Sequence, residues 1–212
     1  SAGKVTLLPI DFNLNTYKYI LRDNQFFKYY FNTIAYTVVS TFISVSFTAL
    51  LAYPLSKPRL RLNKVITPMV VFTMYFAGGT IPNYIVVTQW LGLQDSVWSI
   101  ILPNAISTFN LLVMKSFFAG LPEELEEAAL IDGCGKFVSF FRIILPLSYP
   151  IILSVILIMF LNTWSQFQIP LILASSMETK PMAIVVSEFM TKDTIQYGLI
   201  AAAGMLALIL RR

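Results

Sequence analysis

Five of the eleven acidic residues of this chain stand in one segment, GLPEELEEAALIDGCGKFVSFFRIILPLSYP, at positions 120–150. Pro122 followed by Glu123 and Glu124 predicts the start of a helix, because Pro suits the first helical position and carboxylates complement the positive end of the helix dipole. Taken alone, these acids indicate a surface helix whose carboxylates are solvated.

The same segment predicts two short helices with a tight turn between them. Gly133 and Gly135 are expected to break the first helix, since Gly accepts left-handed backbone angles at little cost. A second helix over 136–144 is expected to end before Pro146, which cannot continue a regular hydrogen-bond ladder. The result would be a helix, a turn and a helix at the membrane surface.

Catalytic chemistry has little support in the composition. The chain has no histidine and a single cysteine, Cys134, which excludes imidazole catalysis, an internal disulfide and a multi-cysteine metal site. A serine or tyrosine without a base is a poor nucleophile. Gly135-Lys136 resembles the end of a phosphate-binding loop, but Leu130 and Phe137 stand where that motif requires Gly and Ser or Thr. We therefore expect no catalytic residue, no metal, and no cofactor bound by this chain.

The rest of the chain is predicted to position this segment by crossing a membrane. Hydrophobic residues make up 57% of the sequence, charged residues only 12%, and the mean hydropathy is +0.72. A helix needs roughly 20 mostly apolar residues to cross the hydrocarbon, and no alternation typical of membrane strands is present. The prediction is an all-α, polytopic membrane protein with five spans, at 29–53, 65–87, 97–118, 150–173 and 195–210.

Loop charge predicts the orientation of these spans. The first connection carries Lys57, Arg59, Arg61 and Lys64 without an acidic residue, which indicates the cytoplasmic side. Alternation then places 121–147 inside and both 89–96 and 174–193 outside. Residues 1–28 are expected to be an extracytoplasmic segment before a permease domain at 29–212. An N-terminal segment that lies outside the membrane without a signal peptide predicts one further span before it. The full protein would then have six spans. The net charge of +4 requires no nucleic acid, since basic cytoplasmic loops are common.

Neutral polar residues inside the spans are the candidates for a path through the membrane. Ionisable residues are absent from the apolar blocks, which argues against coupling to protons or ions. Amides beside aromatic rings suit a sugar, but hydrogen bonds between helices use the same residues. The Pro and Gly residues within the second and third spans are expected to kink these helices. Two interpretations stay open: the kinks shape a cavity, or they are simple irregularities of packing. The candidate set is Thr73, Tyr75, Asn83, Asn104, Thr108, Asn110, Asn162, Trp164 and Gln166.

The acidic segment resembles the EAA loop of binding-protein-dependent transport permeases, and in particular those of the carbohydrate-uptake branch. The resemblance lies in Glu127-Ala128-Ala129, Asp132-Gly133, Leu145-Pro146 and Pro150, and extends more loosely from 13–19 through 76–79 to 162–164. Cys134 departs from the family, which usually has Ala there. The family is also longer at both ends.

This resemblance implies the fold of a type I ATP-binding-cassette importer and a loop that couples it to ATP hydrolysis on a separate subunit. It implies two ATPase subunits that bind ATP and Mg²⁺, a second homologous permease and an extracytoplasmic binding protein, assembled in the lipid of a bacterial or archaeal cytoplasmic membrane. Glu127 would pair with a basic group, and Gly133 would set the turn. The implied docking residues are Glu123, Glu126, Glu127, Ala128, Ala129, Asp132, Gly133, Leu145 and Pro146.

Three other functions make different demands on the sequence. An ion-coupled carrier or a channel without an ATPase would need a charge in the membrane interior or a filter motif. The spans show neither, since their one charged residue, Lys115, stands three positions before the end of the span at 97–118. A membrane-embedded enzyme would need a catalytic constellation inside the spans. A permease for amino acids or metals remains open, because the carbohydrate assignment comes from the resemblance.

Overall fold

The computed structural model describes residues 24–58, 60, 63–76, 78–176, 178–184, 187 and 205. Within these residues the secondary structure consists of helices and turns. The predicted fifth span, apart from Met205, and most of the predicted extracytoplasmic segment 1–28 lie outside the described residues. The predicted all-α architecture is confirmed.

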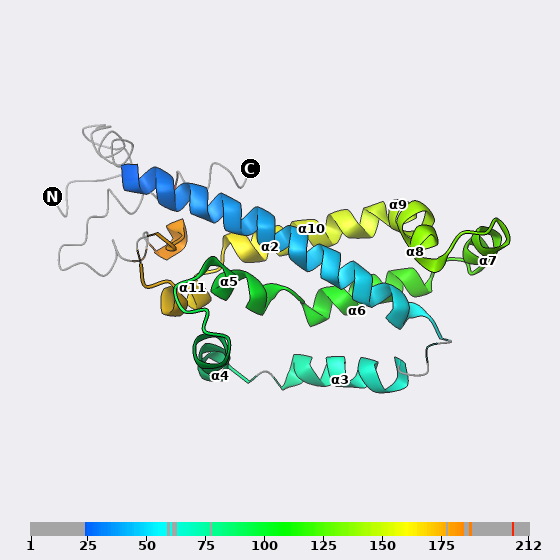
Figure 1. Ribbon diagram of the computed structural model, residues 1–212, viewed down its shortest axis with the longest axis horizontal. Coiled ribbons are helices and arrows are strands. Elements are labelled where there is room, and N and C mark those ends of the chain that lie inside the picture. Colours follow the sequence, from blue (N-terminus) through cyan, green and yellow to red (C-terminus); the bar gives the residue numbers. More distant parts are fainter. Residues whose placement is uncertain are drawn as a thin grey trace, which may run out of the picture.

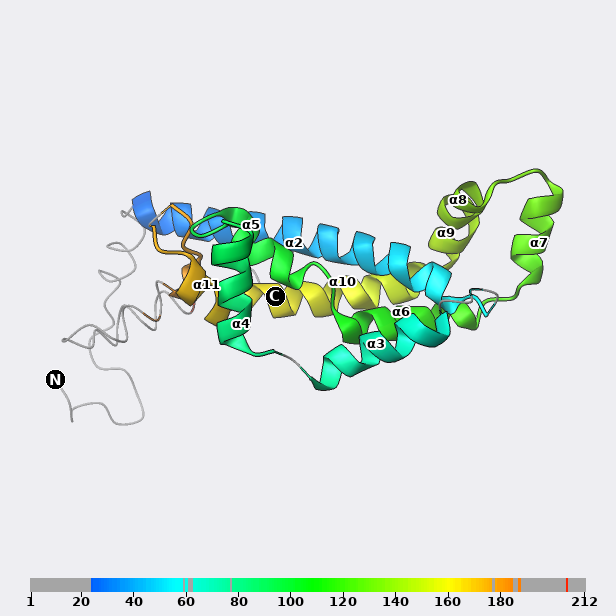
Figure 2. The same cartoon turned by 60° about the horizontal axis from the view of Figure 1, so that its bottom comes forward.

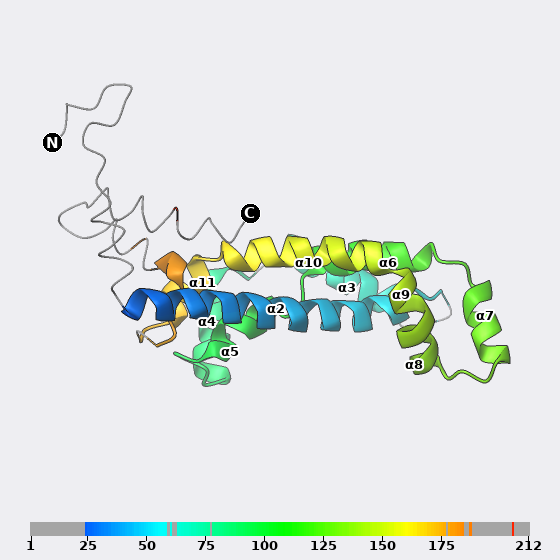
Figure 3. The same cartoon turned by 90° about the horizontal axis from the view of Figure 1, so that it is seen from above.

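One long helix, α2 (Asn24–Ser56), organises the molecule. At 1.5 Å per residue its 33 residues extend about 50 Å. It packs against α6 (Thr108–Ala119) and α10 (Tyr149–Trp164), and Figures 1 and 3 show the three helices running along one another. The buried face of α2 carries small hydroxyl side chains, which allow close approach of helices in a membrane. The fully buried ones are Thr37, Ser40, Ser44 and Thr48.

The second and third predicted spans are both broken. Helix α3 (Asn63–Tyr75) is separated by a 112° bend from α4 (Thr80–Ile85) and the π-helical turn η1 (Val86–Trp90). Gly79 adopts a φ of +85° at this bend, a conformation that favours glycine. Helix α5 (Val97–Ile101) and the 3₁₀ turn η2 (Leu102–Asn104) meet α6 at 45°, just after Pro103.

The fourth predicted span, 150–173, has the predicted limits to within one residue but is broken inside, and the helix before it is longer than predicted. Helix α10 ends at Trp164, and a separate helix α11 (Gln168–Leu173) follows after three residues. Before α10, helix α8 (Lys136–Ser139), the π turn η3 (Phe140–Ile144) and α9 (Leu145–Leu147) are continuous, so the predicted end before Pro146 is wrong. Pro146 falls in the first turn of α9, after the wider π turn, where its missing N–H is tolerated. This run meets α10 at 78°.

Within the described residues, one helix is long and apolar enough to cross a membrane alone, and up to four spans result if each bent pair counts as one. The segments predicted to be inside gather at one end of the bundle. This inner end holds residues 57, 58 and 60 and the loop with α7 (Glu124–Ile131) and α8, which projects beyond α2 and α6 (Figure 2). The outer end holds α4, α5, α11 and the start of α2 (Figure 1). The predicted alternation of loops agrees with this arrangement.

Candidate functional site

The acidic loop at the inner end contains the predicted helix and the predicted turn. Three glutamates lie in the first turn of α7, where the helix dipole favours negative charge. Its other end closes with two hydrogen bonds, from the Gly133 N–H to the Leu130 carbonyl at 3.1 Å and from the Cys134 N–H to the Ala129 carbonyl at 2.9 Å. This is the Schellman arrangement, which needs a left-handed residue after the helix. Gly133, with a φ of +78°, is that residue, as predicted.

An aromatic and aliphatic cluster anchors the loop to the bundle. Phe140 and Ile144 of η3 are buried against Phe118 of α6 and residues of α2 and α10. The Tyr53 ring lies 4.8 Å from the Phe140 ring and 6.1 Å from the Phe118 ring, measured between centroids. Leu145, one of the implied docking residues, packs against this cluster. The base of the loop is thereby part of the core.

Helix α7 of the loop contacts the inner end of α2 through an ion pair. The Lys57 ammonium group forms an ion pair with the Glu126 carboxylate and also lies 5.1 Å from the centre of the Tyr53 ring. A cavity of about 310 Å³ lies beside this pair, with Glu123 and Glu127 in its lining. Glu126 therefore has a partner within the chain, which sequence reasoning did not anticipate.

The remaining implied docking residues divide between exposed and buried positions. Ala129 is only 3% exposed and faces the chain itself, whereas Ala128, Glu127, Asp132 and Pro146 are exposed. Large apolar side chains are also exposed on this loop. Ile131 is 86% and Phe137 78% exposed. An exposed apolar surface bordered by carboxylates is typical of a protein interaction site.

The candidate path residues are only partly brought together. The Asn104 amide of η2 donates to the Gln166 side-chain oxygen at 2.9 Å, joining the third and fourth predicted spans. Asn110 is 1% exposed, and neither its Nδ2 nor its Oδ1 has a hydrogen-bond partner among the described residues. Asn83 lines a cavity of about 440 Å³ at the outer end.

The other candidate path residues are not assembled into one site. Of these, only Thr108 is within the interior helix α6, at its start. The remaining four are partly or largely exposed on α3 and α10, and they are Thr73, Tyr75, Asn162 and Trp164.

The outer cavity combines backbone, amide and aromatic groups from segments far apart in the sequence. Its lining includes Gly78 and Gly79 at the bend of the second span, Asn83 and Tyr84 of α4, and Gln168 of α11. Amides can hydrogen-bond to hydroxyl groups, and a tyrosine ring offers an apolar face. Tyr84 and Gln168 belong to the same pattern of polar and aromatic residues in the spans as Asn83, although the candidate set does not include them.

A polar network at the outer end was missed by sequence reasoning. The Asp95 carboxylate accepts hydrogen bonds from the Thr179 hydroxyl at 2.6 Å and from the N–H groups of Ser176 and Ser175. These bonds, led by the one from Thr179, lower the pKa of Asp95 to about 2. The only signal in the sequence is that Asp95 is a lone acid between two apolar blocks.

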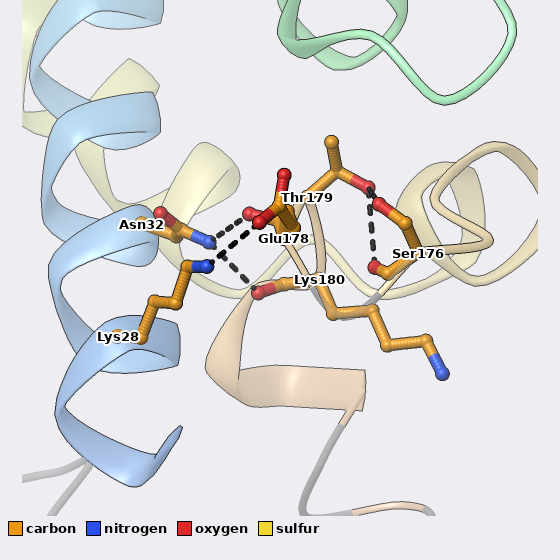
Figure 4. A network of polar contacts seen from close by, with 6 residues as sticks. All are labelled: Lys28, Asn32, Ser176, Glu178, Thr179 and Lys180. Atoms are coloured by element: carbon orange, nitrogen blue, oxygen red, sulfur yellow. Dashed lines mark hydrogen bonds and ion pairs between the residues drawn. The ribbon is translucent and has the colours of Figure 1, made fainter. Parts of the chain in front are cut away.

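The same outer loop is fastened to the start of α2, as Figure 4 shows. Lys28 forms an ion pair with Glu178 at 3.3 Å, and the Asn32 amide donates to the Glu178 carbonyl at 2.7 Å. One turn further along, the Tyr36 hydroxyl donates to the Thr179 carbonyl. The loop is thus held from both the α2 side and the Asp95 side.

One unbroken apolar helix and several broken ones, with an anchored acidic loop at one end and a fastened polar loop at the other, fit an integral membrane protein of the transport class. The chain belongs to the family of binding-protein-dependent transport system inner membrane components, which it matches over residues 44–210. The family predicted from the acidic segment is therefore confirmed, and membership makes the chain a multi-pass protein of the inner membrane. An ion-coupled carrier or channel finds no support in this match.

Individual relatives agree with the family assignment. The chain is 35% identical over 201 residues to the polygalacturonan/rhamnogalacturonan transport system permease protein YtcP of Bacillus subtilis, covering 95% of this chain and 70% of the relative. It is 40% identical over 182 residues to protein LplC of the same organism, covering 86% of this chain but only 61% of LplC. The chain thus spans less than two thirds of that relative.

A solved structure has the same fold. The chain superposes on a subunit in the crystal structure of a bacterial ABC transporter involved in the import of the acidic polysaccharide alginate, with a TM-score of 0.91 and 28% identity. The match covers 99% of this chain and 79% of that chain. The predicted ABC importer permease fold is confirmed.

Proposed function

We propose that the chain forms half of the translocation path of an ATP-driven carbohydrate importer. The observation that carries this proposal is the superposition on the alginate transporter over 99% of the chain, at 28% identity. YtcP, named for polygalacturonan and rhamnogalacturonan transport, supports the carbohydrate assignment. Both names refer to acidic sugar polymers, so the substrate class that we propose is an oligosaccharide containing uronic acid.

The outer cavity is the proposed point of contact with the sugar inside this chain. Asn83 and Gln168 offer amides to hydroxyl or carboxylate groups, while Tyr84 offers a ring face. A volume of about 440 Å³ lies within the ordinary range for small-molecule sites. The second permease subunit would supply the facing wall, and an extracytoplasmic binding protein would deliver the substrate from the outer end.

The exposed part of the acidic loop is the proposed docking surface for an ATPase subunit. Glu127 is exposed and would pair with a basic side chain of that subunit, and Ile131, one helical turn further along, would add an apolar contact. ATP and Mg²⁺ would be bound by two ATPase subunits, since this sequence has no phosphate-binding loop. Closure of those subunits would move α7 and, through it, the membrane helices.

Affinity purification from native membranes tests the assembly. The tagged chain should bring down an ATPase with a phosphate-binding loop, a related but different permease and a binding protein. Recovery of the chain alone, or with only copies of itself, would contradict the proposal. Uptake of a galacturonate oligosaccharide by the purified complex in vesicles, with a neutral oligosaccharide in parallel, then tests the substrate class.

Glu127→Lys tests the docking surface. Reversal of this charge should abolish ATPase binding and uptake while leaving the chain in the membrane, because like charges would then face each other. The matched control is Glu124→Lys, an equal change in the same helical turn at a residue outside the implied docking set. Normal uptake by the Glu127 variant would overturn the assigned role, as would equal loss in both variants.

A further inference from the structure

The inner end of α2 and the helix α7 are joined by an ion pair between residues 69 positions apart. Lys57 directly follows α2, and Glu126 lies in the first turn of α7. The two side chains are only 24% and 22% exposed. Partial burial lowers the screening by water and salt, so their attraction is stronger than that of an open surface pair.

The ion pair lies beside the buried aromatic cluster at the base of the loop. The Lys57 ammonium, which pairs with the Glu126 carboxylate, lies 5.1 Å from the centre of the Tyr53 ring. The Tyr53 ring packs in turn against Phe118 and Phe140, which belong to the buried cluster at the base of the loop. Movement of Glu126 is therefore resisted by α2, α6 and η3 together.

The covalent connections of α7 are less direct. Residues 120–123 join it to α6, and residues 132–135 join it to α8 through the left-handed turn at Gly133. Short turns of this kind are where a chain absorbs changes of angle between helices. A displacement of α7 would therefore be partly absorbed by bending of these two connections. The ion pair, in contrast, joins α7 directly to the end of α2.

We propose that Lys57 and Glu126 are a positioning pair that makes α7 and the inner end of α2 move together when the ATPase subunits close. The inference rests on the proposed function, because it takes α7 to be the docking helix. It assigns Glu126 an internal role, distinct from that of the neighbouring Glu127. It also gives a role in coupling to Lys57, which lies outside the acidic segment.

Transport coupling in the reconstituted complex tests this pair. Uptake per ATP hydrolysed should fall by roughly half or more in Lys57→Gln and in Glu126→Gln, as expected when a partly shielded ion pair is lost. Lys57→Arg, which keeps the charge, should retain coupling. The reciprocal exchange Lys57→Glu with Glu126→Lys should restore it, a rescue that a purely local structural role of either residue would not produce.

The matched control is Lys64→Gln, which removes an exposed lysine from the first turn of α3, seven positions after Lys57. This variant should couple normally. If Lys57→Gln also couples normally while Glu126→Gln does not, Glu126 meets a partner subunit and the proposal is overturned. Failure of the charge exchange to restore coupling has the same consequence.

Amide hydrogen exchange on the full chain in detergent separates this inference from the proposed function. Loss of either charge should speed exchange in α7 by roughly two- to fivefold, and the reciprocal exchange should reverse the effect. These measurements require neither substrate nor ATPase. If the wild-type complex transports no carbohydrate, the proposed function fails, yet the exchange data still show whether the pair holds α7. Unchanged exchange in both single variants would refute the pair itself.

Discussion

Gly133→Ala should loosen the docking helix by a predictable amount. Gly133 has a φ of +78°, and an L-residue in this region costs about 1–2 kcal/mol. A Cβ at this position would meet no atom within 4 Å, so no steric clash adds to that cost. Alanine also restricts the open chain, which offsets about 0.4–1 kcal/mol. The net loss is about 1 kcal/mol, or about fivefold in the opening equilibrium.

Amide hydrogen exchange at short labelling times measures this opening directly. The informative amides are those of Asp132 and Cys134, which donate to the carbonyls of Ala128 and Ala129 at the end of α7. Both should exchange about fivefold faster in Gly133→Ala. Gly133→Asn should show a smaller effect, because asparagine tolerates left-handed angles better than alanine does.

Gly135→Ala is the matched control two residues away. Gly135 has a φ of −67° and a ψ of 157°, which any residue adopts, and its added Cβ would also meet nothing within 4 Å. Exchange in α7 should therefore stay at the wild-type rate in this variant. Equal rates in Gly133→Ala and wild type, or equal acceleration by both alanine variants, would refute the assignment of the left-handed turn as the element that ends α7.

Two further predictions concern the outer end and the bundle interior. Because the pKa of Asp95 is about 2 in the folded protein, below its ordinary value of 3.8, its bonds to the outer loop should hold above pH 4 and fail as the pH falls toward 2. Asp95→Asn should speed amide exchange at Ser175 and Ser176 at pH 7 and abolish that acid dependence; an unchanged acid profile would contradict the assignment. Asn110→Leu should raise the thermal stability in detergent by the equivalent of about 1–3 kcal/mol, because it removes two buried amide atoms that lack partners within the described residues. A fall in stability would show that Asn110 is hydrogen-bonded elsewhere, and a loss of uptake in a stabilised variant would place it in the path.

The sequence was sufficient for the features that depend on local pattern. Long apolar blocks predict spans because backbone groups in hydrocarbon must be satisfied within a helix. The turn at Gly133 follows from the conformational freedom of glycine, and its φ of +78° agrees. The bend near Gly79 and the break after Pro103 fall at residues that the sequence marks, although Pro68 lies inside the continuous helix α3.

Features that depend on contacts between distant segments were not predictable. The break between α10 and α11 contains neither Pro nor Gly; instead, Gln166 accepts a hydrogen bond from Asn104, 62 positions away. The helix through Pro146 is possible because the preceding π turn alters the ladder, and a hydropathy pattern with a period of 3.6 residues does not report that change. The ion pair between Lys57 and Glu126 was not predictable for the same reason, because the two residues are 69 positions apart in the sequence.

Contacts between distant segments hold α2 at both of its ends. Its outer end is fastened to the loop at 178–182 through Lys28 and Asn32, and its inner end to α7 through Lys57. Between them the helix is unbroken over 33 residues, with Pro54 confined to its last turn. A continuous helix resists bending because each turn is hydrogen-bonded to the next, whereas the second and third predicted spans contain bends of 112° and 45°. Of the described elements that connect the two ends, α2 is therefore the one able to transmit a displacement over about 50 Å without an intervening hinge.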